Sequence, residues 1–193
     1  MSQESYAKAG RAKGAIFFSI FGAAWLIVWC LLTYGFKPGI IALISVITIT
    51  IFYASLRKFL RNRTAQSAEG NSPTNKRAGR LFKIVNAVQW ILISAVAIAL
   101  SGLGHQEWII PSIILIIGFH FFPLAAIFKY PLHYVTGATL VLLAIIYPLA
   151  STTGAAGSIS CLGAGIILWS SAIGALMSRP SSQSNSTKND ELT

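Results

Sequence analysis

Long apolar segments alternate with short polar ones along almost the whole chain. Each apolar segment has about the length that a helix needs to cross the roughly 30 Å hydrocarbon core of a membrane, which takes about 20 residues. None of them contains an aspartate, glutamate, lysine or arginine. The pattern therefore predicts an all-α integral membrane protein, a bundle of six transmembrane helices. The predicted spans are residues 14–35, 39–55, 84–103, 108–128, 134–151 and 156–177.

Positive charge is distributed unevenly over the segments between the predicted spans. If each span crosses the membrane once, every lysine and arginine except Lys37 falls on the same side. Cytoplasmic segments of membrane proteins are enriched in these residues, so we predict that the N and C termini are both cytoplasmic. The net charge of +10 then indicates contact with anionic lipid headgroups on the cytoplasmic side of the bilayer. Nucleic acid is not expected as a partner, because the basic residues are spread over several membrane flanks.

The polar segments divide the chain into tails, a membrane domain and one long loop. Residues 1–13 form a predicted cytoplasmic tail, residues 14–178 the transmembrane domain, and residues 179–193 a disordered cytoplasmic tail. Residues 56–83 read as a flexible basic loop, because their middle, AQSAEGNSPTN, is polar and poor in apolar residues. The first apolar run is about twice as long as the core of a secretory signal, which predicts an uncleaved anchor. We expect the plasma membrane of a bacterium.

The six spans can be grouped as three helical hairpins, each entering and leaving on the cytoplasmic side. A three-plus-three inverted repeat, as found in transporters, is the alternative and has no better support in the sequence. In the last span, Gly157, Cys161 and Gly165 recur every fourth residue, and such small faces let membrane helices approach closely. A comparable face around Cys30 predicts contact between the first and sixth spans. The two cysteines lie at similar depths, so a disulfide is one alternative, and a pair of buried free thiols is the preferred one.

Polar side chains inside the spans provide the functional hypothesis, since they are costly in hydrocarbon unless they face a partner or a cavity. Asn86 and Gln89 share one face of the third span. His120 lies at a similar estimated depth in the fourth, so we expect it to hydrogen-bond with Gln89. Pro123 leaves a carbonyl near residue 119 without its helical donor. These three side chains are the predicted pathway or binding site, and helix packing alone is the alternative.

Further basic residues are assigned to the membrane surface. We expect Arg57, Lys58, Arg61 and Arg63 to contact lipid headgroups, and His133 to be an interfacial histidine at the start of the fifth span. No catalytic or metal-binding motif is present in the sequence, and none that binds a cofactor.

The sequence thus favours a small protein for permeation or transport of a solute or ion over an enzyme. A non-catalytic membrane scaffold or accessory subunit is the alternative, and an enzyme acting on a lipid is the third hypothesis. A homo-oligomer or an unidentified membrane partner is compatible with each. No carboxylate lies inside the spans, which argues against a conventional proton-coupled pump.

Overall fold

The computed structural model describes residues 3–69, 73–152, 155 and 157–178, with side chains for 10–61, 76–152, 155 and 157–178. All regular secondary structure in these residues is helical. The long helices are α1 (Gln3–Tyr34), α2 (Pro38–Glu69), α3 (Pro73–Gly102), α4 (Ile109–Phe128), α5 (Leu132–Ala150) and α6 (Ile159–Met177), and a 3-10 turn, η1 (Gln106–Trp108), precedes α4. The predicted tail at 179–193 lies outside the described residues.

Six of the described helices are long and apolar enough to cross a membrane, which confirms the predicted all-helical class. Glycine and proline define the first link. Gly35 has a φ of +70°, a left-handed conformation that ends α1 and that glycine adopts without strain. Pro38 then begins α2, where its fixed φ suits the first turn of a helix. The same device recurs after α3, where Gly104 has a φ of +79°.

The prediction of a flexible loop over residues 56–83 is wrong for most of this segment. Helix α2 continues to Glu69 and α3 begins at Pro73, so most of this basic segment is helical. Residues 56–69 contain neither glycine nor proline and are rich in leucine, arginine, alanine and glutamate or glutamine, which favour helices. Their polarity argues against burial but not against helix. Helix α1 likewise begins at Gln3, inside the predicted tail.

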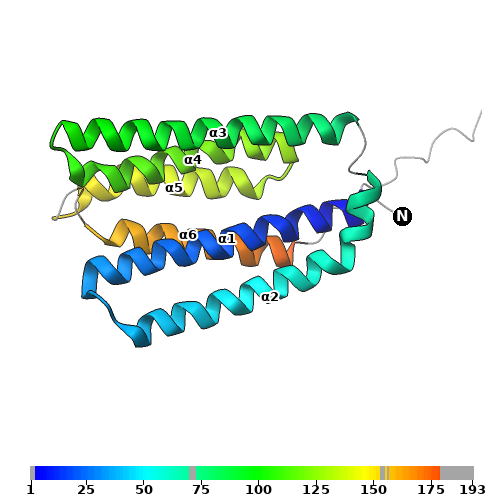
Figure 1. Cartoon of the computed structure of the whole chain (residues 1–193), viewed down its shortest axis with the longest axis horizontal. Helices are drawn as coiled ribbons and strands as arrows, with labels where there is room; N and C mark the ends of the chain where they lie inside the picture. Colours follow the sequence, from blue (N-terminus) through cyan, green and yellow to red (C-terminus); the bar gives the residue numbers. More distant parts are fainter. Residues whose placement is uncertain (1–2, 70–72, 153–154, 156, 179–193) are drawn as a thin grey trace, which may run out of the picture.

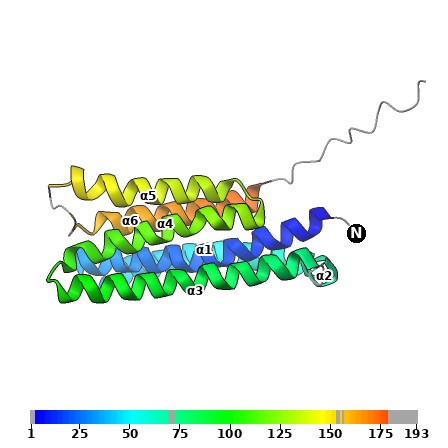
Figure 2. The ribbon, with the colours of Figure 1, turned by 90° about the horizontal axis from the view of Figure 1, so that it is seen from above.

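The helices run side by side along the long axis of the bundle (Figure 1). Helix α1 packs against α2 and α6, α4 packs along α5, and α3 packs mainly against α4 and η1. Figure 1 places α3 and α2 at opposite edges, and Figure 2 shows the same bundle from above, with α3 and α5 at its two edges. The most apolar window of α3 has no buried residue, whereas 39% of that of α1 and 44% of that of α6 are buried. Helices α1 and α6 are therefore central and α3 is peripheral.

The predicted contact between the first and sixth spans is present. A Cβ added to Gly165 would lie 3.0 Å from the carbonyl oxygen of Gly22, so the two backbones nearly touch. Close by, the indole Nε1 of Trp169 donates a hydrogen bond to the carbonyl oxygen of Ser19 at 3.1 Å. Small residues on both helices thus allow the close approach that membrane helices need in order to gain packing energy.

The small-residue stripe of α6 contains one of the two cysteines. Cys161 is completely buried and so is Cys30 of α1, and both thiols are free. The alternative of a bridge between them is therefore not formed in this structure. Gly157, one turn before Cys161, precedes α6 and is half-buried.

Candidate functional site

The segments that carry most of the basic residues meet at one end of the bundle. The first described turns of α1, the last turns of α2, the start of α3 and the link between α4 and α5 all lie there (Figure 1). We call it the basic end. Arg11, Lys58, Arg80 and Lys129 belong to it.

A cluster of aromatic rings surrounds His133 at the basic end. Its imidazole lies edge-on to Tyr130, with ring centroids 5.0 Å apart at 89°, and to Phe18 of α1, at 5.7 Å and 87°. The ring of Phe121 from α4 lies 5.8 Å away and is tilted by 43°. The side chain of His133 is consequently only 8% exposed. The imidazole is thus enclosed by three neighbouring rings, while its expected position at the membrane interface stays a prediction.

Arg11 of α1 covers the outer side of this cluster. Its guanidinium carbon lies 5.0 Å from the centroid of the Tyr130 ring, within the range of a cation–π interaction. The hydroxyl of Tyr130 lies 3.1 Å from that of Ser178, just beyond α6. Tyr130 therefore joins a positive charge from the first helix to the end of the last helix. We call Arg11, Phe18, Phe121, Tyr130 and His133, together with His120, the aromatic-basic cluster.

The turn between α4 and α5 positions Tyr130 and His133. Lys129 adopts a left-handed conformation with a φ of 49°, which ends α4. The N–H of Tyr130 then donates to the carbonyl of Ala125 at 3.1 Å, and the N–H of His133 donates to that of Tyr130 at 3.1 Å. Pro131 occupies the N-cap of α5, where its missing N–H costs nothing. This short turn brings both rings against α1.

Two glycines hold α4 and α5 together one turn from the rings. A Cβ on Gly137 would lie 2.8 Å from the carbonyl oxygen of Gly118 and 3.0 Å from the Cβ of Phe121. The helices therefore cross in backbone contact at this point. The crossing fixes the distance between Phe121 and His133, because both residues lie one helical turn from it.

His120 extends the cluster toward α3. It lies eight residues before the end of α4, or about 12 Å along the helix axis. Its ring neighbours that of Phe121 and faces the backbone of Val85 on α3. In the described part of the chain no hydrogen bond joins His120 to Gln89 or Asn86, both of which are half-buried. The expected bond with Gln89 is absent because α3 presents Val85, about 6 Å nearer the basic end, at the level of His120.

The cluster contains every buried side-chain nitrogen or oxygen that lacks a hydrogen-bond partner among the described residues. These atoms are Nη1 of Arg11, Nδ1 of His120 and Nδ1 of His133. An unpaired buried polar group is costly and rare in native proteins, where local strain, a bound water, a bound ion or a catalytic role accounts for it. All three are nitrogens, and no carboxylate neutralises the arginine in the described residues. The arrangement suits a ligand that carries negative charge or several acceptor oxygens.

A metal centre has no support in the described residues, where no group of three histidine, cysteine, aspartate or glutamate side chains could hold an ion. Among the residues with described side chains, the acidic one is Glu107. It lies near the other end of the bundle, where its carboxylate is 3.4 Å from Nδ1 of His105. Chemistry at the aromatic-basic cluster would therefore rest on positive charge and aromatic surfaces.

The other predicted site residues are separated from this cluster. Arg57 and Arg61 are exposed on α2, whereas the ammonium group of Lys58 donates a hydrogen bond to the carbonyl of Leu176 on α6. The side chain of Arg63 lies outside the described residues. Lys58 therefore joins two helices, a role that differs from the predicted headgroup contact.

Sequence reasoning missed Arg11 and Tyr130 as members of the site. Each lies just outside a predicted span and reads as an ordinary flanking residue. A usable signal was the order Lys129, Tyr130, Pro131 and His133, which concentrates basic and aromatic groups in one short turn. Comparison with known proteins finds no matching family model, no similar curated protein and no similar solved structure.

Proposed function

We propose that this chain is a multi-pass membrane protein that moves a small anionic solute, with the aromatic-basic cluster as its binding site. The six long apolar helices are compatible with a multi-pass membrane protein. The observation that carries the proposal is that the three unpartnered buried nitrogens come from three different helices and belong to a single cluster. An anion bound between them would satisfy donors that otherwise remain unpaired.

The electrostatics of the basic end favour an anion over a cation. Arg11 places a fixed positive charge against the Tyr130 ring, and Lys129 follows α4 directly. Each histidine can offer a further N–H donor from its ring, depending on the tautomer. A cation would meet only these positive or neutral groups. The absence of carboxylates from the six predicted spans points the same way.

In this proposal the solute reaches the cluster from the cytoplasm. Both termini are cytoplasmic, as the distribution of lysine and arginine favours, so the basic end faces the cytoplasm. The solute then passes from Arg11 and His133 to His120, with Asn86 and Gln89 on α3 as the next polar groups. An alkaline phosphatase fusion at Gly104 tests this orientation, because that link should be external and the fused enzyme active.

Halide flux into proteoliposomes that contain an anion-quenched dye tests the transport function. We expect flux with the native chain and a loss of at least about tenfold in Arg11→Gln and His120→Ala, because each removes one unpaired nitrogen. His105→Ala is the matched control, since His105 is exposed and lies outside the cluster. Equal flux in all variants, or no anion flux from folded native protein, would refute the proposal.

A scaffold or accessory subunit is the second candidate function. It is favoured by α3, which packs mainly on α4 and η1 and leaves its apolar window without a buried residue. A partner helix could cover this surface. The two functions predict different results for His120→Ala: loss of flux at unchanged thermal stability supports transport, whereas lower stability and no native flux support a scaffold.

A further inference from the structure

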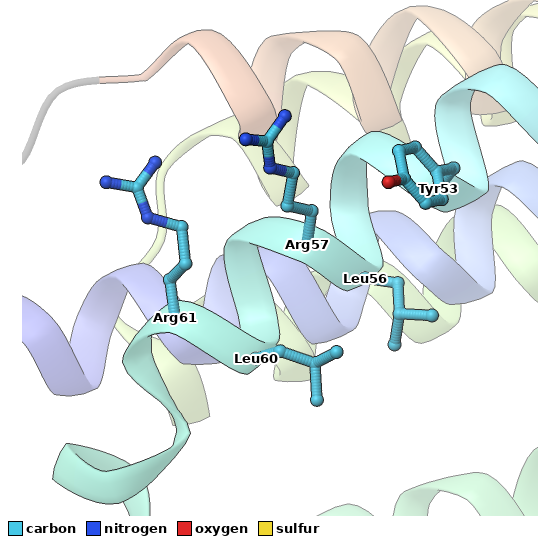
Figure 3. A pocket seen from close by; sticks show the side chains of 5 residues that line it. All are labelled: Tyr53, Leu56, Arg57, Leu60 and Arg61. Carbon is cyan, nitrogen blue, oxygen red and sulfur yellow. The ribbon is translucent and has the colours of Figure 1, made fainter.

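A second group of basic side chains lies on α2, away from the aromatic-basic cluster. Tyr53, Leu56, Arg57, Leu60 and Arg61 line a shallow hollow of about 320 Å³ on the outer surface of the bundle (Figure 3). The transport proposal makes no use of these residues.

The helical spacing sorts these five side chains into two neighbouring stripes. Tyr53, Arg57 and Arg61 follow each other at intervals of four residues, which places them on one face of α2. Leu56 and Leu60 form the adjacent stripe. In Figure 3 the two guanidinium groups and the tyrosine ring extend to one side of the helix, and the two leucines extend to the other. A polar surface and an apolar surface thus meet along the hollow.

Both guanidinium groups are available for a ligand in the described part of the chain. Arg57 and Arg61 are exposed, and no salt bridge to either is present among the residues with described side chains. Lys58, between them in sequence, is different because its ammonium group bonds to the carbonyl of Leu176. The two arginines therefore face outward, whereas the lysine between them connects α2 to α6.

The hollow lies at the end of the apolar stretch of α2, where a membrane surface is expected. The apolar stretch of α2 that could span a membrane is Pro38–Arg61, so the two arginines occupy its final turns. Lipid phosphates lie at this boundary, and tyrosine is enriched there. A planar guanidinium binds phosphate oxygens through two parallel hydrogen bonds. The leucine stripe lies beside the arginines, about 1.5 Å nearer the membrane interior, and suits the start of an acyl chain.

We propose that the hollow on α2 binds one anionic phospholipid, with its phosphodiester between Arg57 and Arg61 and an acyl chain along Leu56 and Leu60. The inference is independent of the transport proposal, since it involves another helix face. It narrows the expected headgroup contacts to two arginines. The proposed lipid would occupy one defined site, whereas a general attraction between basic residues and anionic headgroups would not select a site.

Native mass spectrometry in a non-ionic detergent tests this inference on the full chain. Phosphatidylglycerol is the probe, and phosphatidylcholine is the comparison lipid without net charge. We expect one tightly held phosphatidylglycerol, and binding weaker by roughly 30-fold in R57Q/R61Q, since each arginine near a phosphate contributes about five- to sixfold. R77Q/R80Q is the matched control. It removes two exposed arginines from α3 at the same end of the bundle and should leave binding within about twofold of native.

Two further comparisons decide whether the ligand is a lipid. Leu60→Gln removes apolar surface without changing charge, and we expect it to weaken phosphatidylglycerol binding severalfold while monodispersity is retained. Inorganic phosphate should not displace the lipid at equal concentration. Equal losses in the two arginine double variants would reduce the site to diffuse charge. Displacement by phosphate, or no effect of Leu60→Gln, would overturn a phospholipid site.

Discussion

Replacing Gly165 by alanine tests how closely α1 and α6 must approach. A Cβ at this position would lie 2.6 Å from Cγ of Leu26 and 3.0 Å from the carbonyl oxygen of Gly22. Carbon atoms in favourable contact are about 3.5–4.0 Å apart, so the new atom would be about 1 Å too close. Cγ is the branch point of a leucine that is only 5% exposed, which prevents the side chain from moving aside. The two helices would have to separate.

The expected cost is the difference between two opposing effects. Overpacking a tightly packed contact costs about 1–3 kcal/mol, whereas alanine gains up to about 1 kcal/mol over glycine in helix propensity. From the middle of the overpacking range, about 2 kcal/mol, and the full gain in propensity, we expect a net loss of about 1 kcal/mol. For a domain of this size that is a fall of roughly 2–4 °C in Tm. Thermal unfolding of the purified protein in detergent measures it.

Gly14→Ala is the matched control for this experiment. No atom lies within 4 Å of a Cβ added to Gly14 in α1, so only the helix propensity changes and stability should be equal or slightly higher. The result that would refute the reasoning is Gly165→Ala unfolding at the same temperature as this control.

The opposite side of the contact provides an independent check. A Cβ on Gly22 would lie 2.4 Å from Cδ1 of Trp169 and 3.1 Å from the carbonyl oxygen of Gly165. Gly22→Ala should therefore destabilise the protein as well. Because one separation of the helices relieves both overlaps, the double variant should lose less than the sum of the single losses. Strict additivity would mean that the two glycines do not share a contact.

Three further predictions concern individual contacts. The hydroxyls of Thr136 and Ser171 lie 2.8 Å apart between α5 and α6. A double-mutant cycle with valine and alanine should give a coupling of about 0.6 kcal/mol, and zero coupling would refute an interhelical hydrogen bond. Lys58→Met should lower stability by about 0.5–1 kcal/mol, because it removes the donor to the Leu176 carbonyl near the end of α6, whereas an equal loss in Lys37→Met would contradict this. The two cysteine thiols are buried and free, so a maleimide should label both only after denaturation, and rapid labelling of native protein would argue against their burial.

The number and approximate position of the helices could be predicted because each is encoded locally. A run of about 20 apolar residues has few alternatives to a helix in hydrocarbon, since its backbone groups must bond within the segment. The error at 56–83 has a related cause. A polar segment can be either a loop or an exposed helix, and residues such as Arg57 and Arg61 favour a helix as well as contact with water.

Close helix contacts were partly predictable from the residues themselves. Gly165 and Cys161 lie on a stripe of small side chains, and this pattern indicated that α6 packs tightly against α1. The exact partners were not predictable, because the register between two helices depends on all the side chains at their contact. The sequence predicts Gln89 beside His120, and the structure places Val85 there, one helical turn away on α3. Depth estimated by counting residues is not accurate to one turn.

The sequence by itself determined that this chain forms helices of membrane-spanning length and that positive charge belongs to one end of them. Only the tertiary structure decided which polar groups meet. Nothing in the sequence links His133 to Phe18 or Phe121. In the folded protein their rings, with that of Tyr130, surround its imidazole. The physical reason is that periodicity and composition act within a segment, whereas a buried site is made by side chains from several segments whose packing the local sequence does not specify.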